Sequence, residues 1–545
     1  MYLHRVKFAF SATVFALLIS VEVGSAQDSL KNLPEYSLPL LRDKLVIAHC
    51  MTNIVRFKGH EMEDSCNPKY YSPTGNISAP FGGLTQVNVM ADSLLKNASL
   101  DEAVEFEMRA AIRSGIDGFQ FYYILGSKSW DDIIKAYFRV AKKKNIKFKF
   151  TFCISHPGGR TEADKIAEFA TRINNIMDEV GRDNLHWLRT PDGRLILYQW
   201  YGESLADIPK DLEGLPEAFY VARAYKKLAD AVNEKFACVF TINEEISKKK
   251  LNEYLDYFPA TWIWTLAYRQ DNYIGKMVAE ECKRRQRTFT GSVFGDFYTS
   301  KLLKKGTWDM YHKVEDALKA GPDSVERKYL VTGLSYNFRK LLEFGIERNV
   351  PIINVITWND YPEGHHLAPE VNHNEGFSIL LNHHKSLWRN EPSPYADRDV
   401  AIVFFKKYKH TVKPHPYNLP VVNFQEGAVP ESYEDSIEVV TLLPAKARLK
   451  INRHVCDVPA GLSTRKVASA AGPVAVAVIR QEKPTVHFIT PEGITESPYR
   501  TDRLTYTFSS EFDAFYHDLF DGFQPIYSTE YNPDFMVTAD SEKLR

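Results

Sequence analysis

The chain has 545 residues, of which 44% are hydrophobic and 25% charged, with a formal net charge of -1. This length exceeds what one hydrophobic core usually organises, so the sequence predicts two or more domains. A balanced charge gives no surface field of one sign, which argues against a nucleic-acid partner.

The first 26 residues have the pattern of a signal peptide. Basic residues near the start precede an apolar stretch from Phe8 to Ile19, and small residues then lead to Ala26. The apolar stretch is short for a membrane span of about 20 residues. We therefore expect cleavage after Ala26, rather than a membrane anchor, and a secreted protein, extracellular or periplasmic. No later apolar run is long enough to cross a membrane.

Six cysteines occur in the chain, and export would permit disulfides. Cys50 and Cys66 are the expected bridge because a short loop separates them. Cys153 and Cys238 lie inside apolar runs and are expected to be buried thiols. The sequence contains no Cys-x-x-Cys or His-Glu-x-x-His motif, so it predicts no zinc site, and we expect no metal and no cofactor.

Short apolar runs alternate with helical segments over most of the chain. The runs cover residues 45–49, 118–123, 148–153, 195–200, 237–242, 260–264, 287–293 and 352–357. Helical patterns cover 99–115, which starts with a Ser-x-x-Glu capping box, as well as 163–180 and 325–348. Alternating strands and helices predict a parallel sheet, and eight such units predict an α/β fold, the (β/α)8 TIM barrel.

The pattern changes near residue 415. Beyond it, alternating strand-like runs cover 436–443, 447–451, 474–479 and 485–489, with turn residues between them. Such runs are typical of a β-sandwich. The predicted domains are therefore a signal peptide (1–26), a catalytic barrel (27–415) and a C-terminal β-sandwich domain (416–545).

Catalytic groups in such barrels lie at the C-terminal ends of the strands and in the loops that follow. This rule selects His49, Tyr123, His156, Trp200, Tyr201, Asn243, Glu244, Trp264 and Asp296. Aromatic rings and carboxylates around one mouth suit a ring-shaped ligand with many hydroxyls. The alternative is that these residues pack the barrel or lie in solvated loops.

The eighth run gives the strongest candidates. It is almost wholly apolar and breaks into Trp358-Asn359-Asp360-Tyr361-Pro362-Glu363-Gly364-His365-His366. Two carboxyls three residues apart can serve as general acid and general base, and glycosidic cleavage uses such a pair. Pro362 and Gly364 would let the loop turn both side chains inward. We predict Asp360 and Glu363 as catalytic and Trp358, Asn359, Tyr361 and His365 as substrate-binding; the alternative is a surface turn.

This stretch, together with Val46-Ile47-Ala48-His49, resembles glycoside hydrolase family 71, the endo-α-1,3-glucanases or mutanases. Family 71 members have a similar Trp-Asn-Asp-Tyr-Gly-Glu-Ser-His stretch. The chain also resembles, more distantly, family 99, the endo-α-mannanases and endomannosidases, which have an Asn-Glu-Trp-His-Glu-Gly stretch. Pro362 and Gly364 depart from the family 71 pattern, and Gly364 matches family 99.

The resemblance to family 71 implies an inverting reaction with Glu363 as general acid and Asp360 as base. The resemblance to family 99 implies retention through an anhydro-sugar, with Asp360 deprotonating the sugar's 2-hydroxyl. We expect a secreted endo-acting hydrolase of an α-linked polysaccharide, α-1,3-glucan first. The alternatives are an α-mannan or other α-glycan hydrolase, or a non-catalytic carbohydrate-binding protein. The expected partner is a poly- or oligosaccharide substrate.

Overall fold

We analysed a computed structural model of the chain. The structure describes residues 44–60, 95, 97–126, 128–155, 160–299, 301–311, 314–370, 372–412, 421–490 and 503–517. The predicted signal peptide, Cys66, His156 and the predicted domain boundary at 415/416 lie outside the described residues. Among the described residues, no helix combines the length and apolarity that a membrane span requires.

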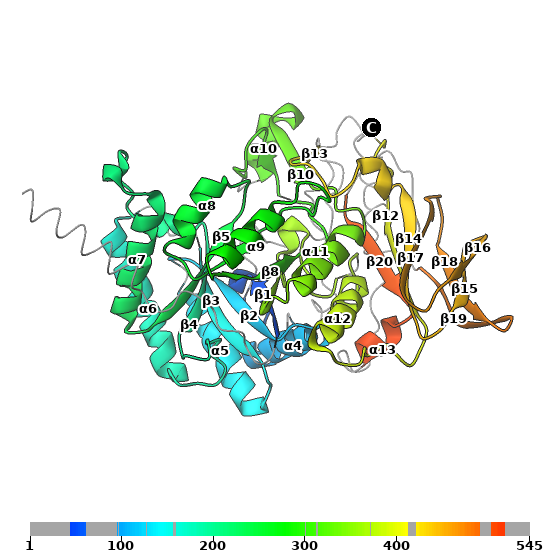
Figure 1. The fold of residues 1–545 in the computed structure, drawn as a ribbon, viewed down its shortest axis with the longest axis horizontal. Helices are drawn as coiled ribbons and strands as arrows, with labels where there is room; N and C mark the ends of the chain where they lie inside the picture. Colours follow the sequence, from blue (N-terminus) through cyan, green and yellow to red (C-terminus); the bar gives the residue numbers. More distant parts are fainter. Residues whose placement is uncertain are drawn as a thin grey trace, which may run out of the picture.

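A parallel sheet of nine strands forms the barrel, in the order β7-β6-β5-β4-β3-β2-β1-β11-β8 (Figure 1). The strands are β1 (Leu45–Cys50), β2 (Gly118–Tyr123), β3 (Lys149–Ser155), β4 (Leu195–Trp200), β5 (Phe236–Ile242), β6 (Ala260–Ile263), β7 (Thr288–Phe289), β8 (Gly291–Val293) and β11 (Ile352–Val355). All eight predicted runs form strands. The seventh is divided at Thr290: β7 pairs with β6 and β8 with β11, so this one run closes the barrel.

Helices cover the outside of the barrel. They are α4 (Leu100–Arg113), α5 (Ser129–Lys144), α6 (Glu162–Val180), α7 (Glu217–Val232), α8 (Lys248–Leu255), α9 (Ile274–Arg284), α10 (Val314–Ala320), α11 (Tyr336–Glu347) and α12 (Gly376–Arg389). The predicted capping box at the start of α4 is present. The Ser99 hydroxyl accepts a hydrogen bond from the Glu102 backbone N–H, and the Glu102 carboxylate accepts one from the Ser99 N–H.

The predicted helix over 325–348 is wrong in its first part. Residues Val325–Tyr329 form the strand β10, which pairs with β9 (Leu303–Lys304) and β13 (Val421–Asn423). All five β10 residues are buried; the first two pair with β9 and the last three with β13. Tertiary pairing outweighs the helical pattern of the sequence here. Only the later part of the segment is helical, as α11.

The C-terminal part is a sandwich of two antiparallel sheets. One sheet has the order β17-β14-β12-β20 and the other the order β16-β15-β18-β19. The strands are β12 (Val400–Lys406), β14 (Ser436–Leu443), β15 (Ala447–Ile451), β16 (His454–Val458), β17 (Gly461–Ala468), β18 (Ala475–Arg480), β19 (Lys483–Ile489) and β20 (Thr505–Ser509), and the short helix α13 (Phe512–His517) follows. Apolar side chains of both sheets share one core, as predicted. Its first strand, β12, lies before residue 415.

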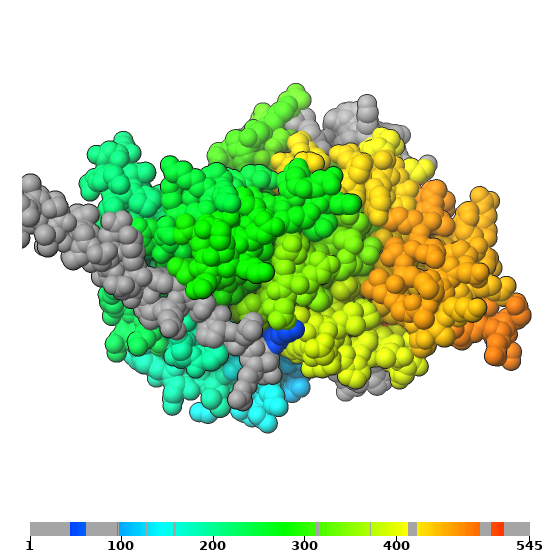
Figure 2. Space-filling model, viewed as in Figure 1, coloured from blue at the N-terminus to red at the C-terminus, as the bar shows by residue number. Residues whose placement is uncertain are grey.

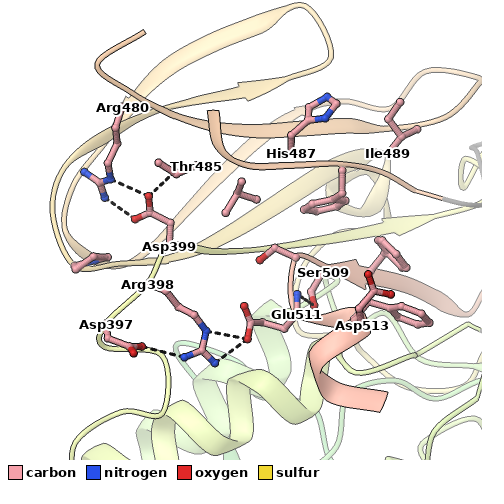
Figure 3. A pocket seen from close by; sticks show the side chains of 16 residues that line it. Asp397, Arg398, Asp399, Arg480, Thr485, His487, Ile489, Ser509, Glu511 and Asp513 are labelled. Carbon is pink, nitrogen blue, oxygen red and sulfur yellow. Dashed lines mark hydrogen bonds and ion pairs between the residues drawn. The ribbon is translucent and has the colours of Figure 1, made fainter. Parts of the chain in front are cut away.

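The sandwich packs against the barrel through α12, which contacts β12 and β20. In the space-filling view the orange surface of the sandwich adjoins the yellow-green and yellow surface that contains α12 (Figure 2). The segment that leads into β12 is held by ion pairs: Arg480 of β18 bridges to Asp399, and Arg398 bridges to Glu511. These pairs border a groove of about 840 Å³ on the sandwich (Figure 3). Both pairs thus fasten the linking segment to the C-terminal sandwich.

A buried carboxylate also joins the two domains. Asp296, in the loop after β8, is completely buried and lies 3.2 Å from the ammonium of Lys406 on β12. It also accepts a hydrogen bond from the backbone N–H of Thr505 on β20. Although burial alone would raise the pKa of Asp296, Lys406 and His373 outweigh it and hold this pKa at about 2. The charge is buried because partners from the sandwich compensate it.

We predict that Lys406→Met strongly destabilises the protein, because it leaves Asp296 as a buried charge without its ammonium partner. Breaking such a pair costs about 3–5 kcal/mol of unfolding free energy. The measurement is the urea midpoint at pH 7 by circular dichroism. Lys446→Met, at an exposed lysine of the sandwich, is the control. Equal midpoints for the two variants would contradict the prediction.

Candidate active site

The last barrel strand continues into the candidate site through Trp358. The backbone N–H of Trp358 donates to the carbonyl of His49, 2.7 Å away, and so extends the β11–β1 pairing. Its side chain is fully buried and points outward, where the indole N–H donates to Glu107 on α4. Trp358 therefore anchors the loop. Its ring does not lie at the barrel mouth, where we predicted it to bind substrate.

The loop after Trp358 folds back on itself. The Thr357 hydroxyl accepts a hydrogen bond from the Asp360 N–H (2.9 Å), and the Thr357 N–H donates to the carbonyl of His365 (2.8 Å). Between them lies the short 3-10 helix η7 (Tyr361–Glu363). Gly364 has φ +70°, and a Cβ there would lie 2.8 Å from the carbonyl oxygen of Tyr298, so this position requires glycine.

This turn brings the two predicted carboxyls together with His365. One oxygen of Glu363 lies 2.6 Å from the ammonium of Lys301 and the other 3.1 Å from Nε2 of His365. The same Nε2 lies 3.9 Å from a carboxyl oxygen of Asp360. Sequence reasoning missed Lys301, which lies in the loop after the seventh strand, and no local pattern marks it.

The environment separates the acidities of the two carboxyls. Burial and the negative charge of Glu363 raise the pKa of Asp360 to about 6. Burial also acts on Glu363, but the Lys301 ammonium and His365 outweigh it and hold the pKa of Glu363 well below its usual range. Below about pH 6 the pair therefore holds its proton on Asp360 and its charge on Glu363. Two carboxyls with separated pKa values form an acid–base pair.

Aromatic rings surround the pair at the mouth of the barrel. The ring of Trp264 lies 5.2 Å from those of His49 and Trp200 and 5.8 Å from that of His365. Tyr201 packs on Trp200 at 4.8 Å, and its side chain is 42% exposed. The structure thus gathers these five predicted residues into one cluster, and Tyr201 offers an open face for a ligand.

Tyr123 faces the other way. Its hydroxyl donates to Asp131 on α5 (2.8 Å), and the ring packs under Arg172 of α6, outside the barrel. Tyr122 instead faces inward, with its ring 5.9 Å from that of His49 and 6.3 Å from that of Trp200. Side chains alternate along a strand, so Tyr122 and Tyr123 must point to opposite faces of β2. The sequence alone does not say which of the two faces the inside of the barrel.

The remaining predicted residues divide by position. Asn359 exchanges two hydrogen bonds with the backbone of Met51 and fixes the loop to the end of β1. Tyr361 packs on the ring of His366 at 4.8 Å. Asn243 and Glu244 line a separate cavity of about 110 Å³ after β5. Asp296 belongs to the interface with the sandwich, where Lys406 holds it, and not to the mouth.

No family model matches the chain, and no curated protein matches it. Among solved structures, it is similar to the GH99 endo-α-mannosidase of Bacteroides thetaiotaomicron, with a TM-score of 0.41 and 12% identity over 64% of this chain and 98% of that chain. A family 2 glycosyl hydrolase of Bacteroides cellulosilyticus gives a TM-score of 0.39 and 11% identity over 82% of this chain and 46% of that one.

The family 1 β-glucosidase of Thermotoga maritima gives a TM-score of 0.34 and 9% identity over 64% of this chain and 98% of that chain. All three TM-scores are below 0.5, so these similarities carry no argument about the activity of this chain. Because one fold hosts many functions, we take the chemistry from the site itself.

We predict that Asp360→Asn changes how stability depends on pH. The folded pKa of Asp360, about 6, is above the unfolded value of about 3.9. The wild type therefore loses stability as pH rises through this window, and Asn does not. The variant should gain on the order of 2 kcal/mol relative to wild type between pH 4 and pH 7.5.

Urea unfolding at several pH values measures this difference. Asp309→Asn is the matched control, because the Asp309 side chain is 74% exposed, and its difference from wild type should stay flat. Parallel pH profiles for wild type and Asp360→Asn would show that the folded state does not favour the protonated carboxyl.

Proposed function

We propose that the chain is a secreted glycoside hydrolase that cleaves an α-linked glycan with Asp360 and Glu363. The observation that carries this proposal is the pair itself. Two carboxyls with separated pKa values lie at the C-terminal end of a barrel strand, with aromatic rings around them. Glycosidic cleavage needs one proton donor and one carboxylate, and aromatic faces supply stacking area for sugar rings.

Within α-glycans, we place an α-mannan-type substrate first and α-1,3-glucan second. The loop supports this order at Gly364, where the backbone packs against Tyr298 and leaves no room for a Cβ. Glycine at this place is the family 99 pattern, whereas family 71 members have serine. Incubation with α-mannan and with insoluble α-1,3-glucan, followed by chromatography of the products, tests the order. A carbohydrate-binding protein would bind one of them and release no sugar.

The charge distribution of the pair supports a specific division of roles. Asp360 has the higher pKa of the two and is proposed as the general acid for the leaving oxygen. Lys301 keeps Glu363 ionised, and Glu363 is proposed as the base or nucleophile. This assignment reverses the one that the family resemblance implies. Proton NMR of the first anomer formed separates inversion from retention.

We predict that substitution of either carboxyl by its amide lowers kcat/KM on the glycan by about 10²–10⁴-fold. Asp360→Asn should keep most activity on an aryl glycoside with an acidic phenol, because that leaving group needs no proton. Glu363→Gln should be poor on both substrates. If Glu363→Gln instead keeps activity on the aryl glycoside and Asp360→Asn does not, Glu363 is the general acid. Full activity of both variants on the glycan would remove the pair from catalysis altogether.

We predict a bell-shaped pH dependence of kcat/KM. Activity should fall as pH rises through about 6, where Asp360 loses its proton, and it should fall at low pH, where Glu363 gains one. Lys301→Met removes the charge that depresses the pKa of Glu363, so the acidic limb should move to higher pH. Lys304→Met, at a half-exposed lysine nearby in the sequence, should leave both limbs in place. An unmoved acidic limb in Lys301→Met would contradict the role given to this lysine.

A further inference from the structure

A second group of ionisable side chains lies directly behind the catalytic loop. His366, Glu370 and His373 are all buried, at 3% exposure or less. Nε2 of His366 lies 3.3 Å from a carboxyl oxygen of Glu370, and Nδ1 of His373 lies 3.7 Å from the same oxygen. One potential ligand atom from each residue falls within 4.8 Å of the others. The mechanism proposed above uses none of these three side chains.

Hydrogen bonds within the protein leave part of this group unsatisfied. Nδ1 of His366 is buried and has no hydrogen-bond partner, and Nε2 faces the Glu370 carboxylate at 3.3 Å without hydrogen-bond geometry. A buried imidazole whose nitrogens make no hydrogen bond is costly inside a protein, unless something else uses a lone pair. A metal ion is such a group.

The other two residues are oriented as metal ligands are. Nε2 of His373 lies 3.4 Å from the buried carboxylate of Asp296, which fixes the ring and directs Nδ1 toward Glu370. A carboxylate behind a histidine is the usual support of a metal-bound imidazole. Glu370 is held in turn by the backbone N–H groups of Asn372 and His373. Its oxygen near the two imidazoles is therefore fixed in place.

We propose that His366, Glu370 and His373 form a binding site for a divalent transition metal, with Zn²⁺ as the expected ion. Two imidazoles and one carboxylate are a donor set that zinc uses. Ligands about 2.0–2.2 Å from a tetrahedral ion stand roughly 3.3–3.6 Å apart, close to the two separations in this group. The His-x-x-x-Glu-x-x-His spacing differs from the motifs whose absence predicted no zinc site.

The site would brace the catalytic loop from behind. Tyr361 of that loop packs on the ring of His366, and the neighbouring His365 contacts Glu363. On the other side, Asp296 links His373 to Lys406 of the sandwich. An ion here would tie the segment that follows the catalytic loop to the interface between barrel and sandwich. The proposal does not depend on the sugar or on the roles of the two carboxyls.

The competing arrangement needs no ion. A protonated His373 could donate from Nε2 to Asp296 and from Nδ1 to the carbonyl of His366, 3.2 Å away. Ion pairs with Asp296 and Glu370 raise the pKa of His373 against the effect of burial, which fits this state. Metal content distinguishes the two arrangements, because only one of them binds zinc.

The test uses the full mature chain without a histidine tag. The protein is loaded with Zn²⁺, dialysed against metal-free buffer and analysed by plasma mass spectrometry. We expect one equivalent of zinc per chain in wild type and none in Glu370→Gln or His373→Ala. His487→Ala, at an exposed histidine of the sandwich, should keep the full equivalent. Glu363→Gln should also keep it, which excludes binding at the catalytic carboxyls.

A second measurement on wild type protects the test against variants that fail to fold. Zn²⁺ added to chelator-treated protein should raise Tm with increasing concentration, since a ligand that binds only the folded state stabilises it. Co²⁺ in its place should give visible absorption that Zn²⁺ abolishes. Wild type that keeps no zinc and shows no Tm response would overturn the proposal and favour the arrangement with a protonated His373 and no ion. Equal zinc in wild type and Glu370→Gln would also overturn it.

Discussion

The way the last barrel strand leaves the sheet determines where the chemistry lies. Trp358 is fixed by its backbone hydrogen bond to His49 and by its buried indole on Glu107. With this side chain held outward, the residues after it must turn over the barrel mouth. Thr357 then closes the turn by bonding to both Asp360 and His365. A fully buried tryptophan therefore positions the candidate catalytic groups.

The same loop carries one paired carboxylate and adjoins another, and each has a lysine partner from a distant part of the chain. At the mouth, Glu363 is paired with Lys301 and His365. At the domain interface, Asp296 is paired with Lys406 and His373. Burying a charge is unfavourable unless its partners are held in place. The loop is consequently coupled to the sandwich through charge as well as through packing, and the sandwich contributes to the geometry of the site.

Much of the fold follows from local pattern. The eight apolar runs were sufficient to predict the barrel strands, because a buried parallel strand needs a continuous apolar segment. The capping box at Ser99 predicted the start of α4 for an equally local reason. The segment 325–348 was predicted as one helix, and its first residues became β10, because pairing partners from distant parts of the chain took their backbone groups. The sequence of the segment itself does not indicate such pairing.

The site residues also divide into those that local sequence predicts and those that a distant partner positions. Asp360, Glu363 and His365 could be predicted, because strand end, turn and motif coincide within a few residues. Asp296 also follows a strand, but its carboxylate pairs with Lys406, 110 residues later, and so lies at the domain interface. Tyr123 was chosen where Tyr122 faces the mouth, since alternation gives two faces and does not say which is inner. Residues whose role is fixed by a distant partner are the ones that the sequence could not place.

Lys301 shows why this division affects the mechanism. Two carboxyls in one turn disfavour each other's ionisation, so the pair keeps one proton up to about pH 6. The lysine, 62 residues before Glu363, forms an ion pair with that member and so favours its charged form. A motif that contains both carboxyls but not the lysine identifies the pair without identifying its acid. For this reason we take the roles from the charge around each carboxyl and the pair itself from the motif.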